Sequence, residues 1–176
     1  MSTETAAAIA AKHVSVLLDR CIELLEPAIS RPNAIVVDAT LGMGGHSLEM
    51  LRRFPELRLI AFDRDPKAIE LAKIRLADHL DRVVFVPAEY DQIAASLEAN
   101  GLSSVDGFLF DLGVSSLQLD DAERGFSYNH DAALDMRMDT TAQLSADVVV
   151  NQYSESEIAK ILREYADEKF AHRIAN

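Results

Sequence analysis

The chain has 176 residues, which is enough for one domain or slightly more with a substantial buried core. Apolar residues make up 49% of it, which excludes a disordered tail. The 17 basic and 29 acidic residues give a net charge of −12. This charge argues against a broad basic nucleic-acid face and suits a site for a cationic small molecule. The single cysteine, Cys21, excludes an internal disulfide, and no apolar run approaches the ~20 residues of a membrane span. We therefore expect a soluble, cytoplasmic protein with no membrane partner.

Amphipathic and apolar segments alternate over the first two thirds of the chain. Helices are expected over residues 16–29 (interrupted by Pro27), 47–54, 64–80 and 90–100, and strands over 34–38, 57–63, 82–88 and 105–111. Asp65 as N-cap and Pro66 as the first helical residue predict one helix start, and Gly101 predicts one helix end. The strands are too apolar to have a solvated face, so the alternation predicts an α/β fold with a parallel sheet covered on both faces.

The pattern changes at about residue 119. Residues 120–141 are polar and irregular, and they form too long a stretch for an ordinary α/β loop. Residues 154–176 predict one helix that begins with a capping box of Ser154 and Glu157. Its apolar stripe is expected to consist of Ile158, Ile161, Leu162 and Tyr165.

Polar or aromatic groups follow each of the four predicted strands. In an open parallel sheet, ligands bind outside the carboxyl ends of the strands. The residues expected there are Asp38, Gly42, Gly44, Gly45, Asp63, Glu89, Tyr90 and Asp111. The plainer alternative is that the glycines form a tight turn and the acids cap helices.

The glycine segment DATLGMGGHS, residues 38–47, is compatible with several ligands. A triphosphate-binding loop would need a lysine after the glycines, and none follows. Gly42 and Gly44 match a dinucleotide motif with Asp63 about 20 residues on, but Ser47 takes the place of the third glycine. An acid four residues before the glycines and another ending the second strand are typical of S-adenosylmethionine enzymes. The glycines would let the backbone approach the donor, Asp63 would accept the ribose hydroxyls, and an aromatic side chain would flank adenine.

Longer motifs then identify a family. The segments DLGVSSLQLDDAERGFSY and LDMRMD resemble the bacterial small-subunit ribosomal RNA (cytosine-N4)-methyltransferase H family, also called MraW. So do KHVSVLLDRCIELL, DATLGMGGHS, AFDRDPKAI and YADEKFAHRIA, and the resemblance runs from about His13 to the last residue. It implies a Rossmann-like class I S-adenosylmethionine-dependent methyltransferase fold.

The resemblance also implies an organisation. Residues 1–118 would be the donor-binding domain, and residues 119–176 the substrate-recognition loop and the beginning of an inserted helical subdomain. The family's enzymes are longer and complete their sheet after this insertion. We therefore expect a fragment that lacks the C-terminal strands.

The family's donor contacts correspond to a defined set of residues. With Asp38 and Gly42 from the glycine segment, the S-adenosyl-L-methionine site comprises Gly44, Gly45, His46, Asp63, Tyr90, Asp111 and Gln118. The family commonly has phenylalanine at the position of Tyr90, which keeps the stacking surface. His46 can act through its backbone alone, and His13 is either part of the donor pocket or a packed histidine.

The implied reaction is methylation of the exocyclic N4 of a cytidine in 16S ribosomal RNA of the small subunit. Asp111 is a candidate proton acceptor, although the resemblance favours donor binding alone. The residues expected at the RNA entrance are Arg124, Phe126, Tyr128, Asp135 and Arg137. The alternative is that the two arginines pair with neighbouring acids and hold the loop in shape. No histidine, cysteine or acid spacing indicates a metal site.

Two other functions stay open at this point. The acidic charge favours a methyltransferase for a small molecule or a protein. A non-catalytic fragment is the other alternative, and its open sheet edge would invite pairing into a homodimer. For RNA, phosphate contacts are expected at Arg52, Arg53, Arg163, Lys169 and Arg173.

Overall fold

A computed structural model describes residues 15–176, with only the backbone described at positions 116 and 117. The chain divides into two compact units, of which the first ends at Ser116 and the second runs from Leu117 to Asn176. This division lies close to the predicted boundary after residue 118. The prediction for His13 lies outside the described residues.

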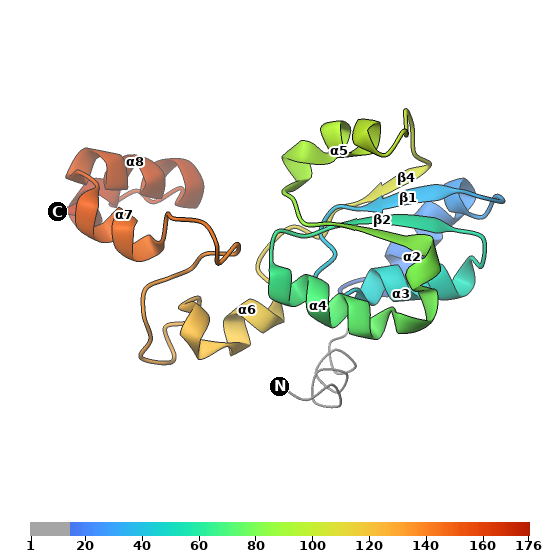
Figure 1. The fold of residues 1–176 in the computed structure, drawn as a ribbon. Helices are drawn as coiled ribbons and strands as arrows, with labels where there is room; N and C mark the ends of the chain where they lie inside the picture. Colours follow the sequence, from blue (N-terminus) through green and yellow to red (C-terminus); the bar gives the residue numbers. More distant parts are fainter. Residues whose placement is uncertain (1–14) are drawn as a thin grey trace. The chain divides into compact units, whose positions relative to one another are not determined.

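The first unit is built on a parallel sheet of four strands (Figure 1). These are β1 (Ile35–Asp38), β2 (Arg58–Phe62), β3 (Val83–Val86) and β4 (Gly107–Leu109), in the order β3-β2-β1-β4. All three strand pairs are parallel, which confirms the predicted α/β fold. The order is that of a Rossmann-like sheet, with β1 at the centre. β4 is shorter than predicted because the backbone N–H of Asp111 bonds to a side chain, that of Thr40, instead of continuing the ladder.

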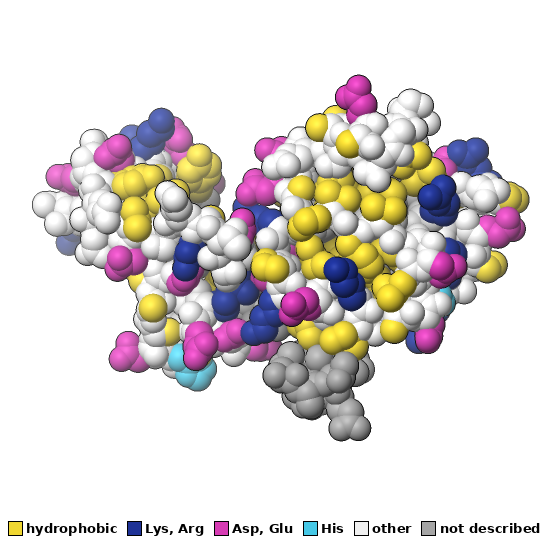
Figure 2. Space-filling view, viewed as in Figure 1, with side chains coloured by type: hydrophobic (Ala, Val, Ile, Leu, Met, Phe, Trp, Pro, Cys, Tyr) yellow, Lys and Arg dark blue, Asp and Glu magenta, His cyan; other side chains and the backbone are white. Residues whose placement is uncertain are grey.

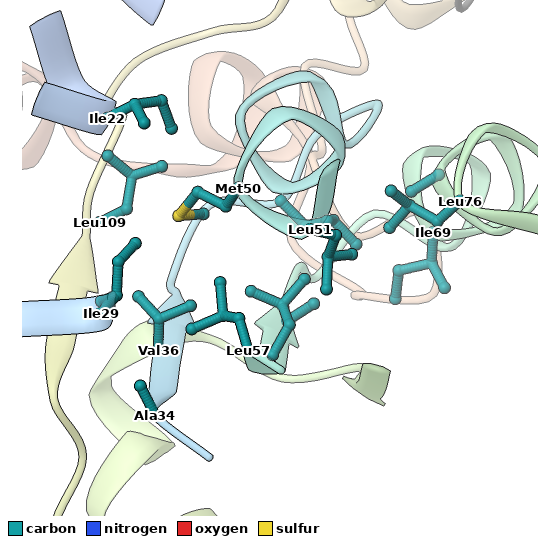
Figure 3. Close-up of a cluster of buried hydrophobic side chains, with 14 residues drawn as sticks. Ile22, Ile29, Ala34, Val36, Met50, Leu51, Leu57, Ile69, Leu76 and Leu109 are labelled. Carbon is teal, nitrogen blue, oxygen red and sulfur yellow. The ribbon is translucent and has the colours of Figure 1, made fainter. Parts of the chain in front are cut away.

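Helices cover both faces of the sheet, as predicted (Figure 1). On one face lie α2 (Leu18–Ile29), α3 (Gly45–Arg53) and α4 (Pro66–Arg75), whose apolar side chains form one core with Val36 and Leu59. On the other lies α5 (Ile93–Ala99), which packs on Val37 and Ile60. Successive strand residues point to opposite faces, so Val36 and Val37 enter different cores. Figure 3 shows the first core, where Ile29, Val36 and Met50 point toward one another.

The sheet is less well covered at its edges. β3 forms one edge, and each of its 4 residues is only partly buried. On this side Figure 2 shows hydrophobic side chains gathered between α5 and α4. β4 forms the other edge, and among the described strands it pairs with β1 alone.

Several helix boundaries differ from the predicted ones. α2 continues through Pro27 to Ile29, and α3 begins at Gly45, because Gly44 takes the left-handed conformation that starts the helix there. The predicted helix over 64–80 is α4 followed by a 3₁₀ segment, η1 (Ala77–Arg82). Its start is as predicted: Asp65 accepts from the Lys67 N–H at 3.0 Å, and Pro66 is the first helical residue.

The second unit is helical. Its elements are α6 (Ser116–Asp120), η3 (Ala122–Arg124), α7 (Ala146–Gln152), α8 (Glu155–Ala166) and α9 (Ala171–Ala175). The capping box is confirmed, with Ser154 N–H donating to the Glu157 carboxylate at 2.8 Å.

The single helix predicted over 154–176 is wrong. The chain turns at Asp167, whose backbone is left-handed (φ 50°), and α9 then packs against α8. Ala159 and Ala171 are buried in this unit, whereas Tyr165 of the predicted apolar stripe is 81% exposed. Among all the described helices, none has both the length and the apolar character that crossing a membrane requires.

The Arg82 side chain anchors the C-terminal end of α3 in the first unit. Its guanidinium donates to the carbonyl oxygens of Leu51 at 2.9 Å, Phe54 at 3.0 Å and Leu57 at 3.3 Å. Carbonyl groups at a helix end have no partner within the helix, and Arg82 supplies a donor to that of Leu51. It also ties in the carbonyls of Phe54, which accepts from the Leu57 N–H as well, and of Leu57.

We expect Arg82→Ala to lower the free energy of unfolding by about 1–3 kcal/mol, because it removes the guanidinium bonds to the carbonyls of Leu51, Phe54 and Leu57. Urea denaturation followed by circular dichroism measures this. The control is Arg20→Ala, which removes only an exposed pair with Glu23 and should cost less than about 0.5 kcal/mol. Equal effects of the two substitutions would contradict the anchoring role of Arg82.

Candidate functional site

The glycine loop, residues 39–45, joins β1 to α3 at the carboxyl ends of the strands. It crosses toward β2, where the Leu41 N–H donates to the Phe62 carbonyl at 2.8 Å. Gly42 and Gly44 have φ values of 52° and 73°, a region that side-chain-bearing residues rarely adopt. The backbone conformation therefore accounts for these two glycines before any ligand is considered.

Gly42 and Gly45 have different surroundings. A Cβ atom added to Gly42 would meet only the Thr40 carbonyl oxygen, at 4.0 Å, so this part of the loop is open. A Cβ added to Gly45 would collide with the Ser15 hydroxyl. Any side chain at Gly45 would displace the Ser15 hydroxyl of the segment that packs on the loop, whereas Gly42 leaves room for a ligand.

The His46 ring holds the same segment. Its Nε2 lies 3.0 Å from the Val16 carbonyl oxygen, and because a carbonyl only accepts, the ring nitrogen donates. The side chain is 6% exposed. The ring therefore has a structural contact of its own, and the predicted donor contact of His46 would involve its backbone.

Asp63 links β2 to the glycine loop. One carboxylate oxygen accepts from the Gly42 N–H at 2.8 Å, and the other accepts from the Asp65 N–H at 2.9 Å. Burial raises the pKa of Asp63, and the two backbone donors oppose the rise. Each carboxylate oxygen can accept a further bond, so this carboxylate can bind a diol while it holds the loop.

Asp38 lies underneath the loop. It is 1% exposed, and its carboxylate accepts from the Ser47 hydroxyl at 2.6 Å and from the Thr40 N–H at 3.2 Å. Burial raises the pKa of Asp38 from 3.8 to about 6. A carboxylate so enclosed supports the loop from below, and a direct donor contact of Asp38 stays a prediction.

Aromatic side chains follow the ends of β3 and β4. Tyr90, in the 3₁₀ segment η2 (Tyr90–Gln92), meets Phe110 edge to face, with ring centroids 6.1 Å apart. Phe110 also stacks on Phe108 at 6.3 Å. Tyr90 and Phe110 are about half exposed, so their rings offer a surface on which a base could stack. Glu89, also predicted at this edge of the sheet, pairs with Arg64 at 3.0 Å.

Asp111 follows β4 and is exposed, and its backbone N–H donates to the Thr40 hydroxyl at 2.7 Å. The role of Thr40 was not predicted from the sequence. The available signal was a hydroxyl residue two positions after the strand-ending Asp38.

Gln118 belongs to the second unit, where it is buried in α6, and its contact with the donor stays a prediction.

Arg124 has a structural position in the second unit. It is 7% exposed, its guanidinium donates to the carbonyl oxygens of Arg137 at 2.8 Å and Met138 at 3.0 Å, and it lies over the Phe126 ring at 5.9 Å. A Cβ added to the neighbouring Gly125 would collide with the Ala133 carbonyl oxygen. These contacts support the alternative in which Arg124 holds the loop, although its partners are carbonyl groups and not the expected acids.

Arg137 and Asp135 form the expected pair. Two parallel hydrogen bonds of 2.8 and 2.6 Å join them, and the bonded guanidinium lowers the pKa of Asp135 to about 2. A third bond, 2.7 Å long, runs from Arg137 to the Ala142 carbonyl. This geometry likewise favours a loop-holding role. Tyr128 differs from all of these, since its ring is 99% exposed.

The described residues contain no cluster of three or more histidine, cysteine or acidic side chains placed to hold a metal ion.

The buried Asp38 should make stability depend on pH. Because its pKa rises from 3.8 to about 6 on folding, unfolding releases a proton between these values, and the free energy of unfolding falls as the pH rises. Asp38→Asn removes this dependence, so the variant should gain on the order of 2–3 kcal/mol relative to the original chain between pH 4 and 7.

Urea denaturation across this pH range measures the difference between the two chains. The control is Asp81→Asn, in the exposed part of η1, which should follow the original chain at every pH. If the free energies of unfolding of the Asp38→Asn variant and the original chain differed by the same amount at every pH, the pKa of Asp38 would not change on folding.

Comparison with known proteins identifies relatives over nearly the whole chain. Residues 10–176 match the family model described as the MraW methylase family. The chain is 58% identical over 164 residues to ribosomal RNA small subunit methyltransferase H of Saccharopolyspora erythraea, covering 93% of this chain and 50% of that protein. With the protein of the same name from Renibacterium salmoninarum it shares 56% identity over 181 residues, covering 100% and 55%.

The chain thus spans about half the length of the curated relatives it matches. Among solved structures, an rRNA methylase from Streptococcus thermophilus is 20% identical, with a TM-score of 0.46 over 57% of each chain. The sequence matches carry the assignment, since the family model covers most of the chain: it belongs to the MraW methylase family.

Proposed function

We propose that this chain forms the donor-binding part of an S-adenosylmethionine-dependent methyltransferase that acts on the exocyclic N4 of a cytidine in 16S ribosomal RNA. The observation that carries the proposal is the bond between the Gly42 N–H and the Asp63 carboxylate. It joins an open glycine turn to a carboxylate that is able to accept from a diol, which supports a donor site at the carboxyl ends of the strands. Family membership and the names of the relatives support the substrate.

The residues present fit the donor. Asp63 has free lone pairs for the ribose hydroxyls, Gly42 leaves its side of the loop open, and Tyr90 offers a half-exposed ring for adenine. The donor supplies a methyl group on a positively charged sulfur, and the carboxylates of Asp63 and Asp111 are suited to such a cation. No phosphate-binding lysine is needed for this ligand.

The acceptor nitrogen is a weak nucleophile because its lone pair is delocalised into the cytosine ring. As this nitrogen takes the methyl group it must lose a proton, and a carboxylate nearby can accept it. Asp111 is exposed at the end of β4 and could accept this proton. The alternative is that Asp111 only binds the donor.

The proposed RNA substrate is the small ribosomal subunit, and the proposed compartment is the cytoplasm, where ribosomes are assembled. A base within folded RNA must be turned out of its stack to be methylated. Of the predicted RNA-contacting residues, Tyr128 has the ring most available for stacking on such a base.

Titration calorimetry with S-adenosylmethionine tests the donor site. We expect saturable binding by this 176-residue chain and an affinity about 10- to 100-fold lower for Asp63→Ala, because charge-assisted hydrogen bonds are lost. The matched control is Asp81→Ala, which removes an exposed acid in η1 and should bind like the original chain. Absence of binding by the folded original chain would refute the donor-binding proposal.

Methyl transfer from labelled donor to unmodified small ribosomal subunits tests the RNA part. Tyr128→Ala should reduce transfer about 5- to 100-fold without changing donor affinity, because it removes one stacking surface. The control is Tyr165→Ala, which removes another exposed tyrosine, on α8. Transfer to free nucleosides or proteins in place of subunits would refute the RNA substrate.

A further inference from the structure

The side chain of Thr40 joins the carboxyl ends of β1 and β4. The last backbone bond between these segments runs from the Ala39 N–H to the Leu109 carbonyl, at 2.9 Å. Beyond it the β1 backbone turns toward β2, as the bond from the Leu41 N–H to the Phe62 carbonyl shows. The Asp111 N–H therefore has no β1 carbonyl to reach, and it donates to the Thr40 hydroxyl at 2.7 Å.

Thr40 is itself held in place. Its N–H donates to the Asp38 carboxylate at 3.2 Å, and the same carboxylate accepts from the Ser47 hydroxyl at 2.6 Å. Ser47 is fully buried in α3. A continuous line of hydrogen bonds thus runs from α3 through the end of β1 to the backbone of Asp111. Because threonine is branched at Cβ, its hydroxyl has few alternative orientations.

The apolar side chains of the segment after β4 are only partly buried. Phe110, Leu112 and Val114 have between 46% and 68% of their surfaces exposed, and Gly113 has a φ of 141° that only glycine adopts readily. A segment with so few buried side chains depends on its backbone hydrogen bonds for a defined position.

We propose that Thr40 is a positioning residue, whose hydroxyl holds the Asp111 backbone so that the carboxylate stays beside the glycine loop. The proposal rests on the proposed function, because it takes Asp111 to face the donor or the acceptor nitrogen. Thr40 acts through Asp111 and needs no contact of its own with either substrate.

Two substitutions separate the hydroxyl from the shape of the side chain. Thr40→Val removes the acceptor and keeps the branched form, whereas Thr40→Ser keeps the acceptor. The control is Thr141→Val in the second unit, where the threonine hydroxyl bonds to Asp139. Each variant is assessed by residue-resolved amide hydrogen exchange without ligand and by calorimetric titration with S-adenosylmethionine.

In Thr40→Val we expect the Asp111 N–H to exchange about 10-fold faster, while the Ala39 N–H, which bonds to a carbonyl, keeps its rate. We expect donor affinity to fall about 3- to 10-fold in Thr40→Val and to stay within about 2-fold in Thr40→Ser. Thr141→Val should change neither quantity.

Unchanged exchange of the Asp111 N–H in Thr40→Val would overturn the proposal whatever the donor affinity. Faster exchange with unchanged donor affinity would also overturn it, since the bond would then be structural only. If the original chain bound no donor, the proposed function would fail by itself, and the exchange rate would still decide whether Thr40 holds Asp111.

Discussion

The candidate site depends on one buried carboxylate at the end of the central strand. Asp38 accepts bonds from α3 through Ser47 and from the start of the glycine loop through Thr40. β1 is flanked by β2 and β4 and covered on both faces, so its end is enclosed by protein. A carboxylate there cannot bond to water, and burial raises its pKa until its protonated and charged forms compete near neutral pH. The hydrogen bonds that compensate for this burial also fix the loop.

The glycine loop is consequently held from three directions. Asp38 supports it from β1, Asp63 binds Gly42 from β2, and His46 fixes the Val16 segment that packs on Gly45. A loop fixed in this way loses little conformational entropy when a ligand binds, which favours affinity. The glycines therefore serve two purposes, since one admits a neighbouring segment of the chain and another leaves space for a ligand.

Features that depend on residues close together in the sequence were predicted better than features that depend on distant residues. The Asp65 cap and the Ser154–Glu157 box were predicted because both depend on residues within three positions of one another. The parallel sheet covered on both faces was predicted because helices and strands alternate along the chain, whereas the strand order came from the structure. The break after α8 was missed because it occurs at Asp167, where neither glycine nor proline marks it.

The candidate site was less predictable because its contacts join residues that are far apart in the sequence. Its residue types at the strand ends could be read from the sequence, but their roles depend on distant partners. The ring of His46 bonds to a carbonyl 30 positions earlier, and Thr40 accepts from a backbone group 71 positions later. No local pattern distinguishes such a threonine from one in an ordinary turn.

Several arginines that could contact the proposed RNA substrate are already bonded within the protein. Arg124 bonds to carbonyl groups, Arg137 to a carboxylate, and Arg53 of the first unit to Glu49 and Asp19. Guanidinium groups that already hold the protein together contribute little to phosphate neutralisation, and forming new phosphate contacts would cost these bonds. Phosphate contacts make binding strongly salt-dependent, whereas stacking on an exposed ring such as Tyr128 does not. The proposed RNA recognition would therefore draw less on Arg53, Arg124 and Arg137 than on an exposed ring such as that of Tyr128.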